Sequence, residues 1–259
     1  YLIFRKILKH LLLKFKSKNY IMHWNPEIYN TFKNVRYQPF YDLAALITDE
    51  NLTNCVDVGC GTGEQTAILA EKFKQANFFG IDSSEEMLEK SKELEHENLH
   101  FEQVTIEDFA NSDSKYDLIF SNAALQWSDN HVELFPKLIS KLNDNGQFAV
   151  QMPCQKENIL NVILSELVQE QPYSDFLSGY HRDSPLLSID EYAKIMFDEV
   201  LKYLNIILRF YPIYADDETD LYNFISGSAL IPYMERFTVH EQELFVKEFM
   251  RRIKNYFEP

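Results

Sequence analysis

The amino-acid sequence predicts an α/β fold with a doubly wound, mostly parallel sheet and a helical cap, on two observations. From Leu52 onward, short apolar runs alternate with helix-length amphipathic stretches, which is typical of βαβ units. The first apolar run ends in a glycine-rich loop, residues 59–63, and a helical pattern follows it. With 259 residues and a hydrophobic fraction of 46%, the chain can bury a core on both faces of such a sheet.

Five strands are expected in this alternation, each of them a short apolar run. The second ends in an acid, Asp82, and the following helix has Ser83 as its expected N-cap, with Glu86 completing a capping box. Helices are also expected at 64–74 and 131–142. The strands are expected at 55–58, 77–82, 99–104, 116–122 and 147–152.

The alternation of strand-like and helix-like patterns ends after Pro153. We therefore take residues 22–153 as a core and residues 154–259 as a helical cap over the carboxyl ends of the strands, where open α/β sheets bind ligands. Within the cap, the β-branched and aromatic run at 205–214 predicts a sixth strand. No later run is suited to a seventh strand that would fill the slot beside the fifth, so we expect a C-terminal truncation.

The first 21 residues differ in composition from the rest of the chain. They carry six basic residues and no acid, and their apolar residues fall on one helical face, which predicts a basic amphipathic helix. We expect residues 1–21 to be a non-native extension upstream of Met22, with a targeting segment as the alternative. Lysines interrupt every apolar run too early for a membrane span.

The charge of the chain limits its partners. Forty acids against 25 Lys plus Arg give a formal net charge of −15, which disfavours a nucleic acid substrate. The three cysteines lack metal-ligand spacing and indicate reduced thiols, so we expect a cytoplasmic protein without a metal site. We expect a monomer.

The glycine loop carries the strongest functional signal. Asp57 ends the first strand, and Gly59, Gly61 and Gly63 let the backbone turn tightly and approach a ligand without Cβ clashes. Nicotinamide-binding loops have the spacing G-x-G-x-x-G, which would require a glycine where this chain has Glu64. The loop therefore favours a ligand without a pyrophosphate, and a purely structural turn is the alternative.

Two further segments belong with this loop. Asp82, at the end of the second strand, can accept hydrogen bonds from both ribose hydroxyls of an adenosine. The exit of the fourth strand, 121–127, has small residues that let a ligand approach the backbone, and Asn122 is suited to contact it. Trp127 in this segment is either part of the site or simple core.

With these motifs in place, the chain resembles the class I S-adenosylmethionine-dependent methyltransferases, a Rossmann-like family, and within them the trans-aconitate 2-methyltransferase group. The likeness is close over residues 22–155 and looser beyond. It implies S-adenosyl-L-methionine as the cofactor and methylation of a small carboxylic acid. The stretches that carry it include Trp24-Asn25-Pro26, Asp57 to Gly63, Gly80-Ile81-Asp82, Leu125-Gln126-Trp127 and Gln151-Met152-Pro153. The implied cofactor-binding residues are Asp57, Gly59, Cys60, Gly61, Gly63, Asp82, Ser83, Met87, Thr105, Ile106, Asn122 and Ala123.

This chain departs from the group's pattern at positions that concern the substrate. Gln38 and Ile231 stand where the group has arginines, and arginine is the residue best suited to carboxylate recognition. Thr105 stands where the group has an aspartate near the adenine, and it can still accept a hydrogen bond. A fatty or isoprenoid acid is therefore an alternative substrate, and a catalytically silent cofactor-binding protein is an alternative of another class.

No catalytic base is expected, because a carboxylate is already an anion at neutral pH. The enzyme would work by holding the acceptor oxygen and the methyl group together and by excluding water. The candidates for positioning are Tyr29, Arg36, Trp127 and His131, and Arg36 is the cation expected to hold a substrate carboxylate. His131 has the alternative role of supporting its own helix.

Overall fold

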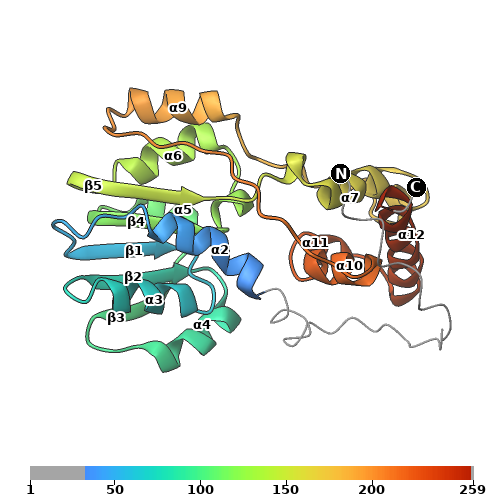
Figure 1. Cartoon of the computed structure of the whole chain (residues 1–259), viewed down its shortest axis with the longest axis horizontal. Helices are drawn as coiled ribbons and strands as arrows, with labels where there is room; N and C mark the ends of the chain where they lie inside the picture. Colours follow the sequence, from blue (N-terminus) through green and yellow to red (C-terminus); the bar gives the residue numbers. More distant parts are fainter. Residues whose placement is uncertain (1–32, 258–259) are drawn as a thin grey trace.

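The computed structural model describes residues 33–257. Its sheet has five strands, all parallel, in the order β3-β2-β1-β4-β5, which confirms the doubly wound prediction (Figure 1). The predicted extension at 1–21 and Tyr29 lie outside the described residues. The strands are β1 (Asn54–Val58), β2 (Asn77–Asp82), β3 (Leu99–Gln103), β4 (Tyr116–Asn122) and β5 (Leu142–Gln151).

The strand order places a crevice at the carboxyl ends of β1 and β4. The chain runs outward from β1 to β2 and β3, and then returns to the other side of β1 with β4. Such a reversal is the point where open α/β sheets bind ligands. The strands point toward the cap, so this edge of the sheet faces the helices of the C-terminal half (Figure 1).

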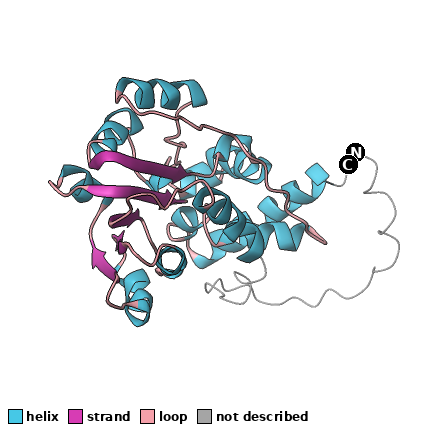
Figure 2. Cartoon of the chain, turned by 60° about the vertical axis from the view of Figure 1, so that its left-hand side comes forward, coloured by secondary structure: helices cyan, strands magenta, loops and turns pink. Residues whose placement is uncertain are grey.

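Helices cover both faces of the sheet (Figure 2). On one face, α2 (Lys33–Ala44) and α3 (Glu64–Lys72) pack against the sheet through a cluster that includes Phe40, Leu69 and Phe120. On the other face, α5 (Ile106–Asn111) and α6 (His131–Ile139) contribute to a second cluster. The helix α4 (Glu85–Ser91) and the short η1 (Lys92–Leu94) connect β2 to β3, and η2 (Leu125–Trp127) follows β4.

The cap has a hydrophobic core of its own. Phe245 and Phe249 are fully buried in it, with parallel rings 6.1 Å apart between centroids. The helix α9 (Ile189–Asp198) belongs to the sheet instead, because its Tyr192 packs on Phe135 of α6. The other elements of the cap are η3 (Gln155–Glu157), α7 (Ile159–Gln169), α8 (Tyr173–Phe176), α10 (Glu218–Ser226), α11 (Ile231–Met234) and α12 (Val239–Phe257).

The predicted sixth strand at 205–214 is wrong. The structure has an extended connection there without strand pairing, and it has no strand after β5 within residues 33–257. A strand requires a neighbour for its backbone groups, and this segment instead leaves Phe210 73% exposed. Its contacts are made by side chains, because Arg209 and Tyr211 both bind Asp42 of α2 at 2.9 and 2.8 Å.

Two local predictions also need correction. The N-cap of α4 is Ser84 rather than Ser83, because the Ser84 hydroxyl accepts the Met87 N–H at 3.3 Å, so the capping box of Ser83 with Glu86 is wrong. The fifth strand begins at Leu142 rather than at 147, because the strand pairing with β4 continues past a register shift near Tyr116.

Candidate active site

The glycine loop connects β1 to α3 and lies against the ends of two neighbouring strands. The N–H groups of Gly59 and Cys60 both donate to the Ile81 carbonyl of β2, at 2.8 and 2.9 Å. On the β4 side, a Cβ added to Gly59 would lie 2.2 Å from the Ala124 Cβ. Gly59, Gly61 and Gly63 all have positive φ, so glycine is required by the path of the loop as well as by its contacts.

Gly61 is the one glycine of the loop whose missing side chain faces open space. A Cβ at this position would meet no atom of the described residues within 4 Å. Its N–H donates to Asp82 Oδ2 at 2.9 Å, and the other oxygen, Oδ1, accepts the Ser84 N–H at 2.9 Å. Asp82 therefore fixes the glycine loop to the end of β2 and leaves the outer side of Gly61 accessible to a ligand.

Asp57 supports this loop from within the core. It is 2% exposed, and its Oδ2 accepts a hydrogen bond from the Thr66 hydroxyl of α3 at 2.6 Å. Burial raises the pKa of the Asp57 carboxyl from 3.8 to about 7; the Thr66 hydrogen bond opposes this shift and the nearby Asp82 charge adds to it. Because Asp57 is enclosed by protein, its side chain acts on a ligand through the shape of the loop.

The raised pKa of Asp57 predicts how stability depends on pH. Between pH 3.8 and about 7 the folded state binds this proton more tightly than the unfolded state, so the free energy of unfolding falls as pH rises through that window. Asp57→Asn keeps an acceptor for Thr66 and removes the titration. The wild-type free energy of unfolding should therefore fall relative to the variant's by up to about 4 kcal/mol across the window.

Urea unfolding at several pH values measures this difference. Curves for Asp57→Asn and the wild type that run parallel from pH 4 to pH 7 would contradict the raised pKa.

The exit of β4 adds an unpaired acceptor to the site. The Asn122 side-chain N–H donates to Gln65 Oε1 at 3.0 Å, while Asn122 Oδ1 is buried and has no partner among the described residues. The next residue, Ala123, has a φ of 54°, and its N–H donates to the Gln151 carbonyl of β5. A buried acceptor without a partner at the crevice indicates a missing ligand donor.

His131 supports this exit rather than facing a ligand. Its Nε2 lies 2.9 Å from the Leu125 carbonyl and 3.0 Å from the Ser128 carbonyl, and its Nδ1 lies 2.6 Å from the Tyr192 hydroxyl. Both ring nitrogens are thus used within the protein, and the imidazole is 1% exposed. His131 fixes the turn η2, at whose end Trp127 is 43% exposed.

The comparisons with known proteins agree with this geometry. A family model described as a methyltransferase domain matches residues 49–201. A protein of Deinococcus radiodurans named trans-aconitate 2-methyltransferase is 34% identical, over 91% of this chain and 92% of its own length. A protein of Escherichia coli strain K12 / DH10B with the same name is 31% identical, over 90% of each chain. This chain is a class I methyltransferase. The solved structure of the plantazolicin methyltransferase BpumL in complex with SAH shares the fold, with a TM-score of 0.50 and 19% identity over 82% of this chain and 85% of that chain.

S-adenosyl-L-methionine is the cofactor of this methyltransferase. The residues present fit it, because the open side of Gly61 would be filled by any side chain and the Asn122 acceptor lacks a donor. Among residues 33–257, no helix is long and apolar enough to cross a membrane.

The structure brings most of the predicted cofactor residues to one edge of the sheet. Ser83 follows Asp82, and Met87, 40% exposed, is in the first turn of α4. Thr105 and Ile106 follow β3, where the Thr105 hydroxyl accepts the Asp108 N–H and caps α5. Their contacts with the cofactor stay predictions, as do those of the glycine loop. The Cys60 thiol is half-buried, and burial raises its pKa well above the usual range, so it stays protonated.

Arg36 is placed between the sheet and the cap of the methyltransferase. Its Nη2 donates to the Phe224 carbonyl of α10 at 2.6 Å, and its guanidinium lies 5.3 Å from the Phe224 ring. Gln38, on the same helix, binds Asp42. Arg36 thus contacts the cap, and its role in binding a carboxylate stays a prediction.

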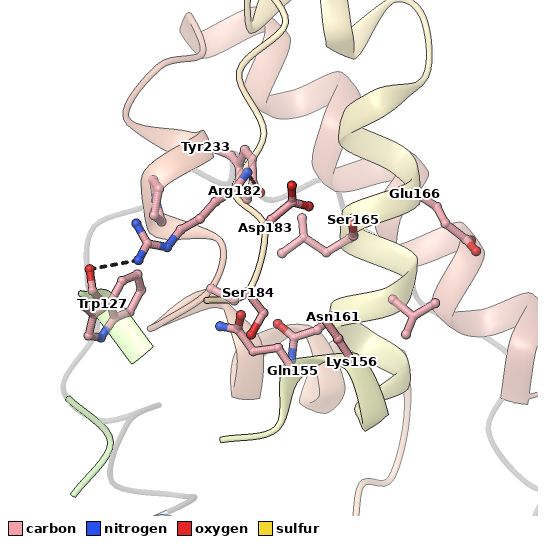
Figure 3. A pocket seen from close by; sticks show the side chains of 14 residues that line it. Trp127, Gln155, Lys156, Asn161, Ser165, Glu166, Arg182, Asp183, Ser184 and Tyr233 are labelled. Atoms are coloured by element: carbon pink, nitrogen blue, oxygen red, sulfur yellow. Dashed lines mark hydrogen bonds between the residues drawn. The ribbon is translucent and has the colours of Figure 1, made fainter. Parts of the chain in front are cut away.

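A cavity of about 260 Å³ lies in the cap beside Trp127 (Figure 3). It is lined by residues of η3, α7, α11 and the connection at 182–184. Of its lining residues, only Trp127 is a site residue predicted from the sequence. Arg182 could not be predicted, because it lies in an irregular segment without a motif. Only the tertiary structure brings it to η2, 55 residues away, where its Nη2 donates to the Trp127 carbonyl at 2.9 Å.

Proposed function

We propose that this methyltransferase methylates a carboxylate of a small organic acid and gives a methyl ester and S-adenosylhomocysteine. The observation that supports this most is the cavity beside Trp127. Its volume of about 260 Å³ is below the ~300–1,000 Å³ that is usual for sites of drug-sized ligands. Its lining is polar, with two cations, Lys156 and Arg182, and two acids, Glu166 and Asp183. A small polar acid fits these properties better than a long fatty or isoprenoid chain.

The cofactor part of the proposal rests on the edge of the sheet described above. When bound, S-adenosyl-L-methionine supplies an electrophilic methyl group on a sulfonium, and its transfer to a carboxylate oxygen leaves a thioether and an ester without moving a proton. We assign the binding of this cofactor to these residues: Asp57, Gly59, Cys60, Gly61, Gly63, Asp82, Ser83, Met87, Thr105, Ile106, Asn122 and Ala123.

The residues around the acceptor have to position it and exclude water. A carboxylate needs no general base, and His131, the histidine nearest to this turn in sequence, has both ring nitrogens engaged in the protein. Trp127 offers an indole face and an N–H donor at the cavity, at the end of the turn η2 that follows β4. Holding the acceptor oxygen close to the methyl group in a dry site is then the main contribution to rate.

The product identifies the reaction. We expect incubation of the enzyme with S-adenosyl-L-methionine and a panel of small acids to yield O-methyl esters, which mild alkali hydrolyses back to the acid. Mass spectrometry before and after alkali is the measurement. An alkali-stable N-methyl or C-methyl product would contradict the proposal.

Further parts of the proposal concern partners and location. The formal charge of −15 supports an enzyme that does not use nucleic acid as its substrate. Cys55, Cys60 and Cys154 are all free, which supports action in the reducing cytoplasm. We also expect the enzyme to act as a monomer.

A further inference from the structure

Arg182 is held at the cavity by the turn that follows β4. Its Nη2 donates to two successive backbone carbonyls, Gln126 O at 3.1 Å and Trp127 O at 2.9 Å, and its guanidinium lies 5.2 Å from the centre of the Trp127 ring. Its own backbone N–H donates to the Tyr233 hydroxyl of α11 at 3.1 Å. The guanidinium is therefore fixed in position before any ligand arrives.

The fixed guanidinium keeps donors for a ligand. All of its hydrogen bonds to residues 33–257 come from Nη2, so Nε–H and the two Nη1 protons have no acceptor in the described part of the chain. Figure 3 shows the Arg182 side chain reaching across to Trp127, with Ser184, Gln155 and Asn161 on the neighbouring wall of the cavity. Arginine with unused donors, held against an aromatic ring, is suited to a carboxylate.

The charges of the lining limit the number of carboxylates. The cavity has two basic side chains, Lys156 and Arg182, and two acidic ones, Glu166 and Asp183. Two carboxylates can each have a cation as a partner. A third would have no cation of the lining as its partner, in a pocket that also holds two acidic side chains, which disfavours a tricarboxylate.

The chemistry of the methyl transfer sets a lower limit on the number of carboxylates in the substrate. A carboxylate held by a guanidinium through both oxygens has part of its negative charge neutralised and is a weaker nucleophile toward a methyl sulfonium, whereas an ammonium acts as a point charge and leaves one oxygen free. The carboxylate that anchors the substrate and the one that accepts the methyl group are therefore different groups. A monocarboxylate has only one of these two groups, and a tricarboxylate exceeds the two cations of the lining.

We propose that the cavity is the acid pocket of this enzyme, that Arg182 anchors one carboxylate of the substrate, and that the substrate is a short dicarboxylate whose other carboxylate is methylated. This inference rests on the proposed function, in that it names the substrate class for the same site. It also assigns the role of anchoring cation to a residue that replaces, in function, the arginines absent at Gln38 and Ile231.

Three acids with the same trans double bond separate the possibilities: crotonate with one carboxylate, fumarate with two and trans-aconitate with three. For the wild type we expect kcat/KM to be highest for fumarate. For Arg182→Gln we expect the KM for fumarate to rise about 10- to 100-fold, the loss that corresponds to one charged hydrogen-bonded partner. Arg182→Lys should recover part of this loss. The KM for crotonate should change little, because crotonate has no second carboxylate for the arginine to hold.

Two controls distinguish the binding of a carboxylate by Arg182 from a purely structural role. Arg251→Gln removes the same charged group from an exposed pair with Glu248 on α12, outside the cavity lining, and should leave all three acids unaffected. The affinity of Arg182→Gln for S-adenosylhomocysteine, by calorimetry, should equal that of the wild type. Equal losses for crotonate and fumarate, or a parallel loss of cofactor affinity, would show that Arg182 only supports the turn.

Binding of fumarate to the enzyme loaded with S-adenosylhomocysteine separates this inference from the proposed function. Esters formed from crotonate or trans-aconitate as readily as from fumarate would overturn the dicarboxylate assignment and leave carboxyl methylation standing. Fumarate that binds through Arg182 without any ester from any acid would contradict carboxyl methylation and keep the pocket. Fumarate that neither binds nor reacts would overturn the pocket.

Discussion

Gly61→Val is expected to abolish the binding of S-adenosyl-L-methionine and leave the protein folded. Gly61 has a φ of 56° and nothing within 4 Å of its added Cβ, so the valine side chain enters the open space beside the loop without clashing with the protein. The strain of the left-handed backbone costs roughly 1–2 kcal/mol of stability. The side chain then occupies the space that the cofactor needs, and calorimetric titration should give no detectable heat.

Gly179→Val is the matched control for this variant. Gly179 also has a positive φ, of 76°, and also has open space at its Cβ, but it lies in the cap after α8. It should show a similar fall in the unfolding midpoint with unchanged cofactor affinity. If Gly61→Val binds the cofactor as the wild type does, Gly61 is a turn residue only.

Asp82→Ala should weaken cofactor affinity by about 100-fold or more. Two hydrogen bonds from ribose hydroxyls to a carboxylate, each worth ~1.5–3 kcal/mol, account for that loss. The variant also frees the Gly61 and Ser84 N–H groups that Asp82 now accepts, which loosens the loop that approaches the ligand. Calorimetry with S-adenosylhomocysteine measures the change in Kd.

Asp117→Ala separates the effect on binding from the effect on stability. Asp117 also accepts two backbone N–H groups, from Thr53 and Asn54 at 3.0 and 2.9 Å, but these lie at the opposite end of β1. Both variants should lose stability, and only Asp82→Ala should lose cofactor affinity. An Asp82→Ala protein with wild-type affinity would remove this residue from the site.

The sheet and its ligand-binding edge could be predicted because their signals are local. Cys55, Val56 and Val58 are buried on both faces of a central strand, and such a strand is recognisable from its apolar run alone. The glycines after it have to be glycines because of their own φ values. Each of these features depends on a few consecutive residues.

The segment at 205–214 and the acid pocket depend on neighbours that are distant in sequence. The run from Ile206 to Tyr214 has the composition of a strand, but composition does not supply a pairing partner, and side chains bind it to Asp42 instead. Arg182 has no pattern around it, and its position is set by the carbonyls of Gln126 and Trp127. The cap of α4 was misplaced by one residue, because Ser83 and Ser84 are equally good cap residues by type.

The cap is formed by segments that are far apart in the sequence. The helices α7 and α12 are joined by the bidentate pair of Arg252 with Glu170, 82 residues apart, while the chain between them leaves to place α9 on the sheet. Contacts between distant segments cost more loop-closure entropy than those of the glycine loop, where Gly61 and Asp82 are 21 residues apart. Local unfolding should therefore separate α12 from α7 more readily than the glycine loop from β2, and amide exchange would show this as faster labelling of α12 than of β1. Such opening of the cap would leave the glycine loop and its contact with Asp82 in place.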